Sequence, residues 1–208
     1  RHGAAAPFLP ALEAIAADLP ADRAGLRLHG IATLADLLGA EALGGEAARL
    51  LGPDARPVRA ILFDKTSAAN WALGWHQDRT IAVRTRAEVP GFGPWSIKAG
   101  MIHVEPPFAL IEHMVTIRIH LDAVPDDNAP LLVAPGSHRL GRIAEADLAS
   151  VVDECGTIPC LADPGDIWVY ATPIVHASAA STRLGRRRVF QIDYSADALP
   201  DGLDWLGV

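Results

Sequence analysis

The spacing of hydrophobic residues changes character in the first third of the chain. Within residues 10–55, apolar side chains recur at helical spacing in three patches. The first patch begins at Pro10 and stops at Pro20, because proline fits the first turn of a helix and disrupts later turns. The last patch is closed by Gly52 and Pro53. Residues 10–55 are therefore predicted to form a helical N-terminal part that covers another layer of the fold.

Short runs rich in β-branched and aromatic residues follow, separated by proline and glycine. Several strands without helices between them favour an antiparallel sandwich or barrel. We therefore expect one domain over residues 1–208, mainly β, with its barrel core at 58–196. The predicted strands are Val58–Asp64, Trp75–Val83, His113–Leu121, Leu131–Ala134, Asp166–Tyr170 and Arg188–Tyr194.

Residues 84–107 carry seven prolines and glycines and read as one long loop. A loop of this length inside a compact domain is usually a lid or a binding loop, and otherwise disordered. Trp95 and Lys98 lie in it. The stretch is predicted to be a lid.

The composition limits the classes of binding partner that this protein can have. A net charge of −7 argues against a surface for nucleic acid, and no uninterrupted apolar run reaches the roughly 20 residues of a membrane span. Cys155 and Cys160 are too few for a disulfide scaffold and are expected to be free thiols in a reducing compartment. These features predict a cytoplasmic protein without a nucleic-acid or membrane partner.

A candidate metal site starts with His76 and Asp78. These residues are separated by one position in a predicted strand, so their side chains are expected on the same face. The pair alone is weak evidence, because one His-x-Asp occurs easily by chance. His176, which follows the strand Asp166–Tyr170, supplies a third ligand. Two imidazoles and one carboxylate hold iron(II) and leave positions open for a 2-oxo acid and dioxygen, whereas a closed structural site would use four protein ligands.

Arg187 is the candidate anchor for the cosubstrate. A guanidinium binds a carboxylate through two parallel hydrogen bonds, which suits the distal carboxylate of 2-oxoglutarate. The run Arg186-Arg187-Arg188 leaves the choice open on composition alone. Strand alternation places Arg188 with an apolar face that would meet the N-terminal helices, and it places Arg187 on the opposite face, toward the barrel.

The motifs together resemble the phytanoyl-CoA dioxygenase family. They are Trp75-His76-Gln77-Asp78, the stretch Asn128-Ala-Pro-Leu-Leu-Val-Ala-Pro-Gly-Ser-His138, His176-Ala-Ser178 and Arg187. The resemblance covers most of the chain after about Val58. It implies a double-stranded β-helix, or jelly roll, with helices packed on its larger sheet.

The resemblance also implies roles for single residues. The His-x-Asp, the distal histidine and the arginine eleven residues beyond it would bind Fe(II) and 2-oxoglutarate. Ser178 matches a position that helps bind the cosubstrate, and Lys65 matches a recurring lysine to which we assign no firm role. Ala129 departs from the family, which usually has glycine there; a positive φ would cost alanine roughly 1 kcal/mol. Asp78 favours oxidation over halogenation, because related halogenases lack this carboxylate.

Strand His113–Leu121 supplies further polar residues. Thr116, Arg118 and His120 share the face opposite its apolar residues and would line the barrel. We assign Thr116 to cosubstrate binding. Arg118 would contact a carboxylate of substrate or cosubstrate, or form an internal salt bridge with Asp193. Further candidate substrate contacts are Lys65, Trp75 and Trp95.

The predicted function is an Fe(II)- and 2-oxoglutarate-dependent dioxygenase that uses O2 to hydroxylate a small-molecule C–H bond, with desaturation and ring closure also open. Three alternatives remain at this point. One is a cupin-like metalloenzyme without a 2-oxo acid, which would leave Arg187 without a task. The others are a non-enzymatic jelly-roll binding module and zinc held by the same three ligands.

Overall fold

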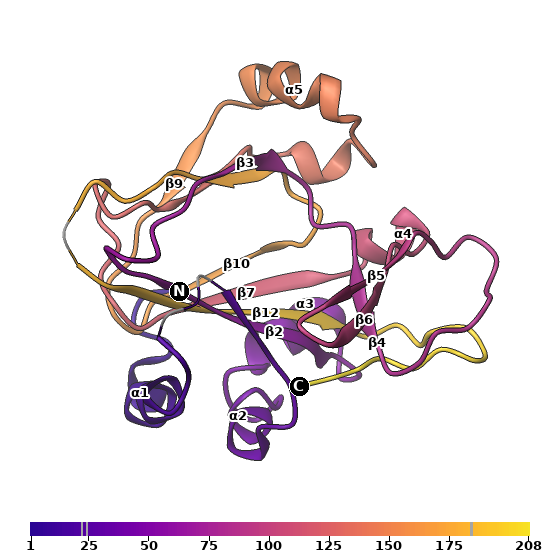
Figure 1. Cartoon of the computed structure of the whole chain (residues 1–208), viewed down its shortest axis with the longest axis horizontal. Coiled ribbons are helices and arrows are strands. Elements are labelled where there is room, and N and C mark those ends of the chain that lie inside the picture. The colour runs from indigo at the N-terminus through magenta and orange to yellow at the C-terminus, as the bar shows by residue number, and fades with distance from the viewer. Residues whose placement is uncertain (22, 24, 184) are drawn as a thin grey trace.

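The computed structural model describes residues 1–21, 23, 25–183 and 185–208. Its strands form three antiparallel sheets, and its helices are short (Figure 1). None of the described helices is long and apolar enough to cross a membrane. The α-helices are α1 (Leu9–Ala17), α2 (Ala32–Leu37), α3 (Gly45–Leu51), α4 (Phe108–Glu112) and α5 (Leu148–Cys155), and single 3-10 turns are η1 (Ala6–Phe8), η2 (Ser137–Arg139) and η3 (Glu145–Asp147).

The largest sheet has five strands in the order β1-β2-β12-β7-β10. Neighbouring strands are antiparallel, and β12 lies at the centre, paired with β2 on one side and β7 on the other. The strands are β1 (Gly25–Leu28), β2 (Arg56–Lys65), β12 (Arg187–Ser195), β7 (Val115–His120) and β10 (Ile167–Ala171).

A four-stranded sheet in the order β3-β11-β8-β9 lies across from the larger one (Figure 1). The two sheets enclose the interior in which the candidate site residues meet. The strands of this sheet are β3 (Leu73–His76), β11 (His176–Ser178), β8 (Leu131–Val133) and β9 (Ile158–Cys160).

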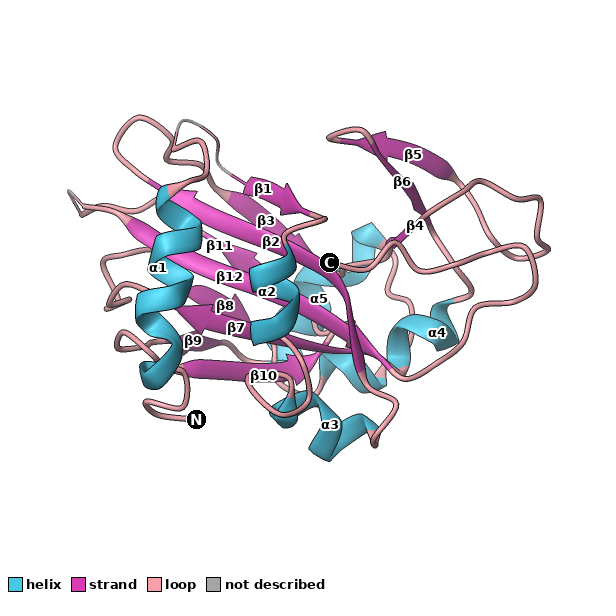
Figure 2. Cartoon of the chain, turned by 90° about the horizontal axis from the view of Figure 1, so that it is seen from below, coloured by secondary structure: helices cyan, strands magenta, loops and turns pink. Residues whose placement is uncertain are grey.

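Helices α1, α2 and α3 cover the outer face of the five-stranded sheet, as Figure 2 shows for α1 and α2. Alternation along β12 explains the packing: Phe190, Ile192 and Tyr194 point outward into a core shared with Leu12 and Leu34 of the helices. The hydroxyl of Tyr194 donates a hydrogen bond to the carbonyl of Leu38 at 3.0 Å. The predicted mainly-β fold with N-terminal helices on its larger sheet is confirmed.

Helix α5 covers the outer face of the four-stranded sheet and was not predicted. Leu148 and Val152 of this helix pack with Ala134 and Val175. Cys155 ends α5, and Cys160 is buried in β9; both thiols are free, as predicted.

The predicted loop at 84–107 is wrong as a description of the backbone. It contains the hairpin of β5 (Trp95–Lys98) and β6 (Met101–Val104), and β6 also pairs with β4 (Ile81–Val83). The hairpin forms because Ile102 and Val104 alternate toward an apolar cluster, whereas Pro90 to Pro94 and the Ala99-Gly100 turn only delimit it. Its role as a lid stays a prediction.

Three further boundaries differ from the predictions. The helical part 10–55 contains β1, in which Leu26 and Leu28 face the helices while the alternate residues face the interior. The predicted strand Trp75–Val83 breaks into β3 and β4. The predicted strand His113–Leu121 begins later, at Val115, because the helix α4 and its C-terminal turn take up the preceding residues.

Candidate metal centre and ligand cavity

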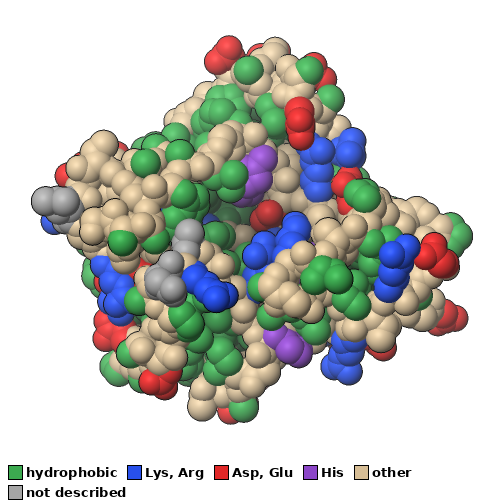
Figure 3. Space-filling view, viewed as in Figure 1, with side chains coloured by type: hydrophobic (Ala, Val, Ile, Leu, Met, Phe, Trp, Pro, Cys, Tyr) green, Lys and Arg blue, Asp and Glu red, His purple; other side chains and the backbone are tan. Residues whose placement is uncertain are grey.

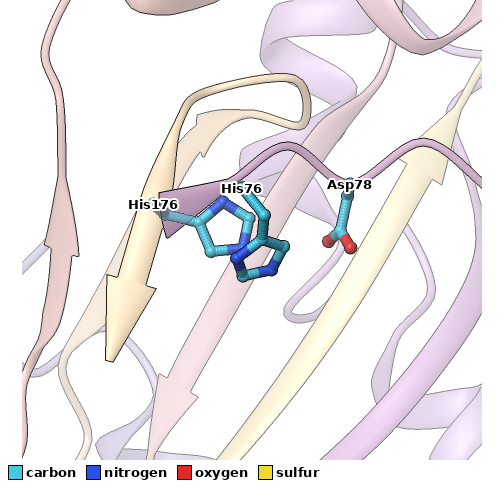
Figure 4. Close-up of side chains that lie close together, drawn as sticks. All are labelled: His76, Asp78 and His176. Atoms are coloured by element: carbon cyan, nitrogen blue, oxygen red, sulfur yellow. The ribbon is translucent and has the colours of Figure 1, made fainter. Parts of the chain in front are cut away.

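His76 and His176 lie directly opposite each other on neighbouring antiparallel strands. They are register partners of β3 and β11, so both side chains project from the same face of the four-stranded sheet, toward the interior. Their ring centroids are 4.3 Å apart, with the ring planes tilted by 55° (Figure 4). The strand pairing therefore brings together two imidazoles that are a hundred residues apart in sequence.

Asp78 completes the set, although the predicted strand geometry is wrong. β3 ends at His76, and Asp78 lies in the extended segment beyond it. The buried side chain of Gln77 fixes this segment: its Nε2 donates to the carbonyl of Pro173 at 2.8 Å, and its Oε1 accepts from the backbone N–H of Ile143 at 2.9 Å. One ligand atom from each of His76, Asp78 and His176 lies within 4.8 Å of the others (Figure 4).

Backbone carbonyls orient both imidazoles. Nδ1 of His76 lies 2.7 Å from the carbonyl oxygen of Gly74, and Nδ1 of His176 lies 2.8 Å from that of Ile174. A carbonyl only accepts, so each Nδ1 carries the hydrogen and each Nε2 keeps its lone pair for the centre of the group. Burial lowers the pKa of His176 to about 4 in spite of the nearby Asp78, so its ring is neutral at physiological pH. Neutral imidazole is the form that binds a metal.

Asp78 is held as a carboxylate by its neighbours. Burial alone would raise its pKa, but Arg59 and the two histidines lower it to about 2. Arg59 Nη2 lies 3.2 Å from Asp78 Oδ2, and the amide of Gln191 donates to the same oxygen at 3.3 Å. The Nε of the same guanidinium donates to Asp193 Oδ2. Asp78 is therefore ionised and oriented before any metal binds.

The three consecutive arginines have different partners. Arg186 forms a bidentate pair with Asp64, and Arg188 forms one with Asp122 on the outer side of the sheet. Arg187 points into the interior, where it is 2% exposed. Among the described residues it contacts no carboxylate; its Nη1 donates to the carbonyl of Ala129, and its Nε has no partner. Burial, with help from Arg118, lowers the pKa of Arg187 to about 9.

Lys65 and Ser178 lie beside Arg187. Lys65 is the register partner of Arg187 on β2, and its Nζ donates to Ser178 Oγ at 3.0 Å and to the carbonyl of Ala179. The ammonium also lies 4.9 Å from the ring centroid of Trp71. Burial, together with Arg187 and Arg118, lowers the pKa of Lys65 to about 7. Lys65 and Arg187 form a cationic end of the interior, and Ser178 adds a hydroxyl group beside them.

Arg118 faces the same interior, but the salt bridge considered with Asp193 is not present. Asp193 is paired with Arg59 instead, and Arg118 Nη1 donates to the side-chain oxygen of Gln191 at 2.5 Å. The guanidinium lies 5.3 Å from the ring centroid of Phe63. Its Nε is buried and has no partner among the described residues. The contact of Arg118 with a ligand carboxylate stays a prediction.

Three other predicted contacts lie outside the walls of the cavity. Thr116 is buried and donates to Asp193 Oδ1 at 2.8 Å, so it supports the partner of Arg59. Trp75 points to the opposite face of β3 from His76 and packs under α5. Trp95 lies in the small sheet, where Arg86 covers its ring. These positions give no support to direct roles in ligand binding.

The site residues line one cavity between the sheets, which opens on the face shown in Figure 3. A histidine and an acidic side chain are visible in the hollow, with Lys and Arg side chains beside it. The cavity walls include four residues with charged or amide side chains that the sequence did not single out as ligand contacts. Arg59 could have been found, because alternation along β2 places it on the same face as Lys65. The four are Arg27, Arg59, Lys98 and Gln191.

Ala129 occupies the position at which the family usually has glycine, and its φ is +50°. This is the left-handed region, which costs a residue with a Cβ about 1 kcal/mol. The conformation turns its carbonyl toward Arg187, which donates to it. The left-handed conformation is therefore present at this position even though it holds alanine and not the usual glycine.

Comparisons with known proteins agree with this geometry. A family model described as phytanoyl-CoA dioxygenase matches residues 29–189, whereas no curated protein sequence matches the chain significantly. The chain is similar in fold to EctD from S. alaskensis in its apoform, with 18% identity, a TM-score of 0.66, and coverage of 99% of this chain and 72% of EctD.

Two further solved structures are similar. AviO1 from Streptomyces viridochromogenes Tue57 has 22% identity, a TM-score of 0.58, and coverage of 95% of this chain and 83% of AviO1. HygX from Streptomyces hygroscopicus, with nickel and 2-oxoglutarate bound, has 13% identity, a TM-score of 0.62, and coverage of 94% and 81%. The fold is thus the predicted double-stranded β-helix. Because the family model spans most of the sequence and the His-x-Asp and distal His meet in space, the chain belongs to the phytanoyl-CoA dioxygenase family.

Proposed function

We propose that this protein is an Fe(II)- and 2-oxoglutarate-dependent dioxygenase that hydroxylates a C–H bond of a small molecule and releases succinate and CO2. The observation that carries the proposal is the convergence of His76, Asp78 and His176 in a cavity that also holds the buried Arg187, which has no carboxylate partner among the described residues. Membership of a dioxygenase family supports it.

The three ligands fit iron(II). Both Nε2 atoms are free to coordinate, because both Nδ1 atoms are engaged with backbone carbonyls. Asp78 contributes a carboxylate oxygen, and three protein ligands leave positions for other molecules. When bound, iron(II) would activate dioxygen and couple the oxidative decarboxylation of 2-oxoglutarate to oxidation of the substrate.

Arg187 is proposed to hold the distal carboxylate of 2-oxoglutarate. Its guanidinium is already oriented by the Ala129 carbonyl, and the unpartnered Nε is available to donate. Ser178 and Lys65 lie beside it and can donate to the same carboxylate. A charge-assisted pair formed in a buried site is strong, because water does not compete for either partner.

Gln191 links the two ends of the site. Its side-chain oxygen accepts from Arg118 while its amide donates to Asp78, so it fixes the position of the metal carboxylate relative to the cationic end. The β5–β6 hairpin contributes Lys98 to the cavity wall. We propose that residues 84–107 close over the bound substrate and limit the access of water.

The test uses adjacent arginines as a matched pair. Iron(II) and 2-oxoglutarate are added anaerobically, the visible charge-transfer band of the chelate is titrated, and succinate is measured after air is admitted. We expect Arg187→Ala to weaken 2-oxoglutarate binding by about 30-fold or more, since truncating one partner of a buried charge pair costs about 2–5 kcal/mol. Arg186→Ala removes an equal charge that is paired with Asp64, and we expect a change below threefold.

The outcomes separate the alternatives. No band and no succinate in the wild type would indicate a binding module or a different metalloenzyme. A band that survives Arg187→Ala with unchanged affinity would refute the anchor while leaving the iron site intact. Metal analysis of the purified protein, with iron and zinc compared at equal concentration, tests the zinc alternative.

A further inference from the structure

The cavity walls carry far more positive than negative charge. Six lysine and arginine side chains line it, but Asp78 is the only carboxylate among the described lining residues. Asp193, which is buried behind the cavity wall, is already paired with Arg59. Arg59 is paired with Asp78 and Asp193, but burying the other cations without a carboxylate partner is costly, and an anionic ligand would offset this cost. The six are Arg27, Arg59, Lys65, Lys98, Arg118 and Arg187.

The cations fall into two groups at different ends. Lys65 and Arg187 face each other across β2 and β12 and belong to the proposed cosubstrate end. Arg27 lies on edge strand β1 opposite Ile61, which is four residues before Lys65 on β2. At about 3.3 Å per residue, these positions are roughly 13 Å apart along the sheet. Arg27 therefore lies well away from Arg187, the proposed anchor of the distal carboxylate of 2-oxoglutarate.

Lys98 approaches Arg27 from another sheet. It lies on β5 of the hairpin, and its Nζ is 3.3 Å from Thr80 Oγ1 in the segment that follows Asp78. Neither Lys98 nor Arg27 forms an ion pair with any described residue, and the Nε of Arg27 is buried without a hydrogen-bond partner. Burial and then Arg27 lower the pKa of Lys98, and burial and then Arg59 lower that of Arg27. The two cations thus repel each other across a shared space.

Apolar groups line the same cavity. Ile61 and Phe63 lie on β2, from the register position of Arg27 toward Lys65. Trp71, beside Lys65, and Leu73, the register partner of Ser178, lie at the cosubstrate end. They offer a wall for a carbon skeleton, whereas the two cations offer donors for an anionic group.

We propose that the substrate is an organic anion, a carboxylate or a phosphate ester, whose charged group is held by Arg27 and Lys98 while its carbon skeleton lies against the apolar wall near the metal ligands. This inference rests on the proposed oxygenase function. It assigns the binding of substrate charge to a pair distinct from Arg187. Arginine would give the anion two parallel hydrogen bonds, and lysine would add a point charge.

The experiment uses protein loaded anaerobically with Fe(II) and saturating 2-oxoglutarate. The chelate band is recorded first, so a failure of the proposed function shows before any substrate probe is added. A panel of carboxylic acids with their methyl esters, and of phosphate monoesters with their parent alcohols, is then screened by thermal shift. We expect anionic members to stabilise the loaded protein and their neutral counterparts not to. The two arms distinguish carboxylate from phosphate.

Variants locate the binding site of the anion that gives the largest thermal shift. By calorimetry, Arg27→Gln and Lys98→Gln should each weaken its binding by about 10- to 100-fold, as expected for a lost hydrogen bond to a charged group. Affinity for 2-oxoglutarate should stay within twofold. Arg27→Lys and Lys98→Arg keep the charge and should retain most of the affinity. Arg49→Gln, on the outer surface of α3, is the charge control and should change nothing.

Two results would overturn the proposal. One is a panel in which the anions bind no better than their neutral counterparts. The other is equal binding of the best anion by the wild type and by the Arg27→Gln/Lys98→Gln double variant, with 2-oxoglutarate still bound.

Discussion

Arg59 is predicted to be the residue whose loss costs most stability in the absence of metal. Arg59 is 8% exposed, and its guanidinium lies between two carboxylates, Asp78 at 3.2 Å and Asp193. Nη1 donates to the carbonyl of Thr80 at 3.1 Å. Arg59→Met keeps the length of the side chain and removes the charge. The buried Asp193 and the half-buried Asp78 then lose their shared counter-ion.

The burial of these ion pairs sets the expected loss in free energy of unfolding. Removing one partner of a buried ion pair costs about 3–5 kcal/mol, because the remaining charge stays desolvated. We expect Arg59→Met to lower the free energy of unfolding by an amount in that range. Asp193→Asn in the same background removes one of the stranded charges, so the double variant should be less destabilised than the sum of the single ones. A coupling of about 2 kcal/mol is reasonable for residues in direct contact.

The assay is urea unfolding followed by circular dichroism, with EDTA present so that metal binding does not add to the stability of the folded state. Arg49→Met is the control, since Arg49 is 57% exposed and pairs with Glu46 on the surface of α3, and it should lose under about 1 kcal/mol. Metal titration of Arg59→Met should show roughly 10- to 100-fold weaker binding, because Asp78 loses the group that orients it.

Additive effects of Arg59→Met and Asp193→Asn would refute the reasoning, and so would a loss no larger than that of the control. Either result would mean that water or a side-chain movement compensates the two carboxylates. The network Asp78-Arg59-Asp193 would then be a packing feature and not the support of the metal ligand.

Three further predictions concern the same interior. Ala129→Gly should raise the free energy of unfolding by about 1 kcal/mol, since φ is +50° there, and a destabilised variant by urea unfolding would contradict this. His120 has its pKa lowered to about 3 by burial, then Arg118 and Arg187, so below its unfolded pKa of about 6.5 the unfolded state binds the extra proton. The His120 contribution to stability should fall from pH 6.5 toward pH 4 by up to about 1.4 kcal/mol per unit. In urea unfolding at stepped pH, His120→Leu should make the slope shallower by that contribution, while the contribution of His176 remains. Lys65, whose pKa is lowered to about 7, should take up a proton when 2-oxoglutarate binds at pH 8. Calorimetry in buffers of different ionisation enthalpy should show this uptake, and Lys65→Met should abolish it.

Alternation along single strands could be predicted from the sequence and proved correct. In β12, Phe190, Ile192 and Tyr194 face the helices, and Arg187 faces the interior. A period of two is a local property of the backbone, so a long strand with one apolar face reveals its orientation without knowledge of its partners.

The position of Asp78 was predicted for a reason that is only partly right. The carboxylate does reach His76, but it does so from an extended segment and not from the strand. Contacts of Gln77 with Pro173 and Ile143 determine that segment, and they join residues that lie 66 or more positions apart. Such contacts leave no periodic signal in the sequence.

Arg27 and Lys98, the proposed substrate anchors, were missed for the same physical reason. Arg27 lies in a strand of four residues, placed between helical patches, and its inward direction depends on pairing with β2. Lys98 was assigned to a loop because proline and glycine surround a hairpin of two four-residue strands. Strands this short are stabilised by their neighbours and not by their own sequence, so the propensities of the chain do not reveal them.

The pairing of Lys65 with Arg187 indicates that this interior is built for binding at a cost to stability. Like charges directly opposite each other on neighbouring strands are destabilising, and here both are almost fully buried. The lowered pKa values of both groups follow from burial and from mutual repulsion with Arg118. A folded protein gains nothing from this arrangement until an anion lies between the cations. An anionic ligand that binds only the native state would therefore both occupy the site and stabilise the fold, and the gain would grow with its concentration relative to Kd.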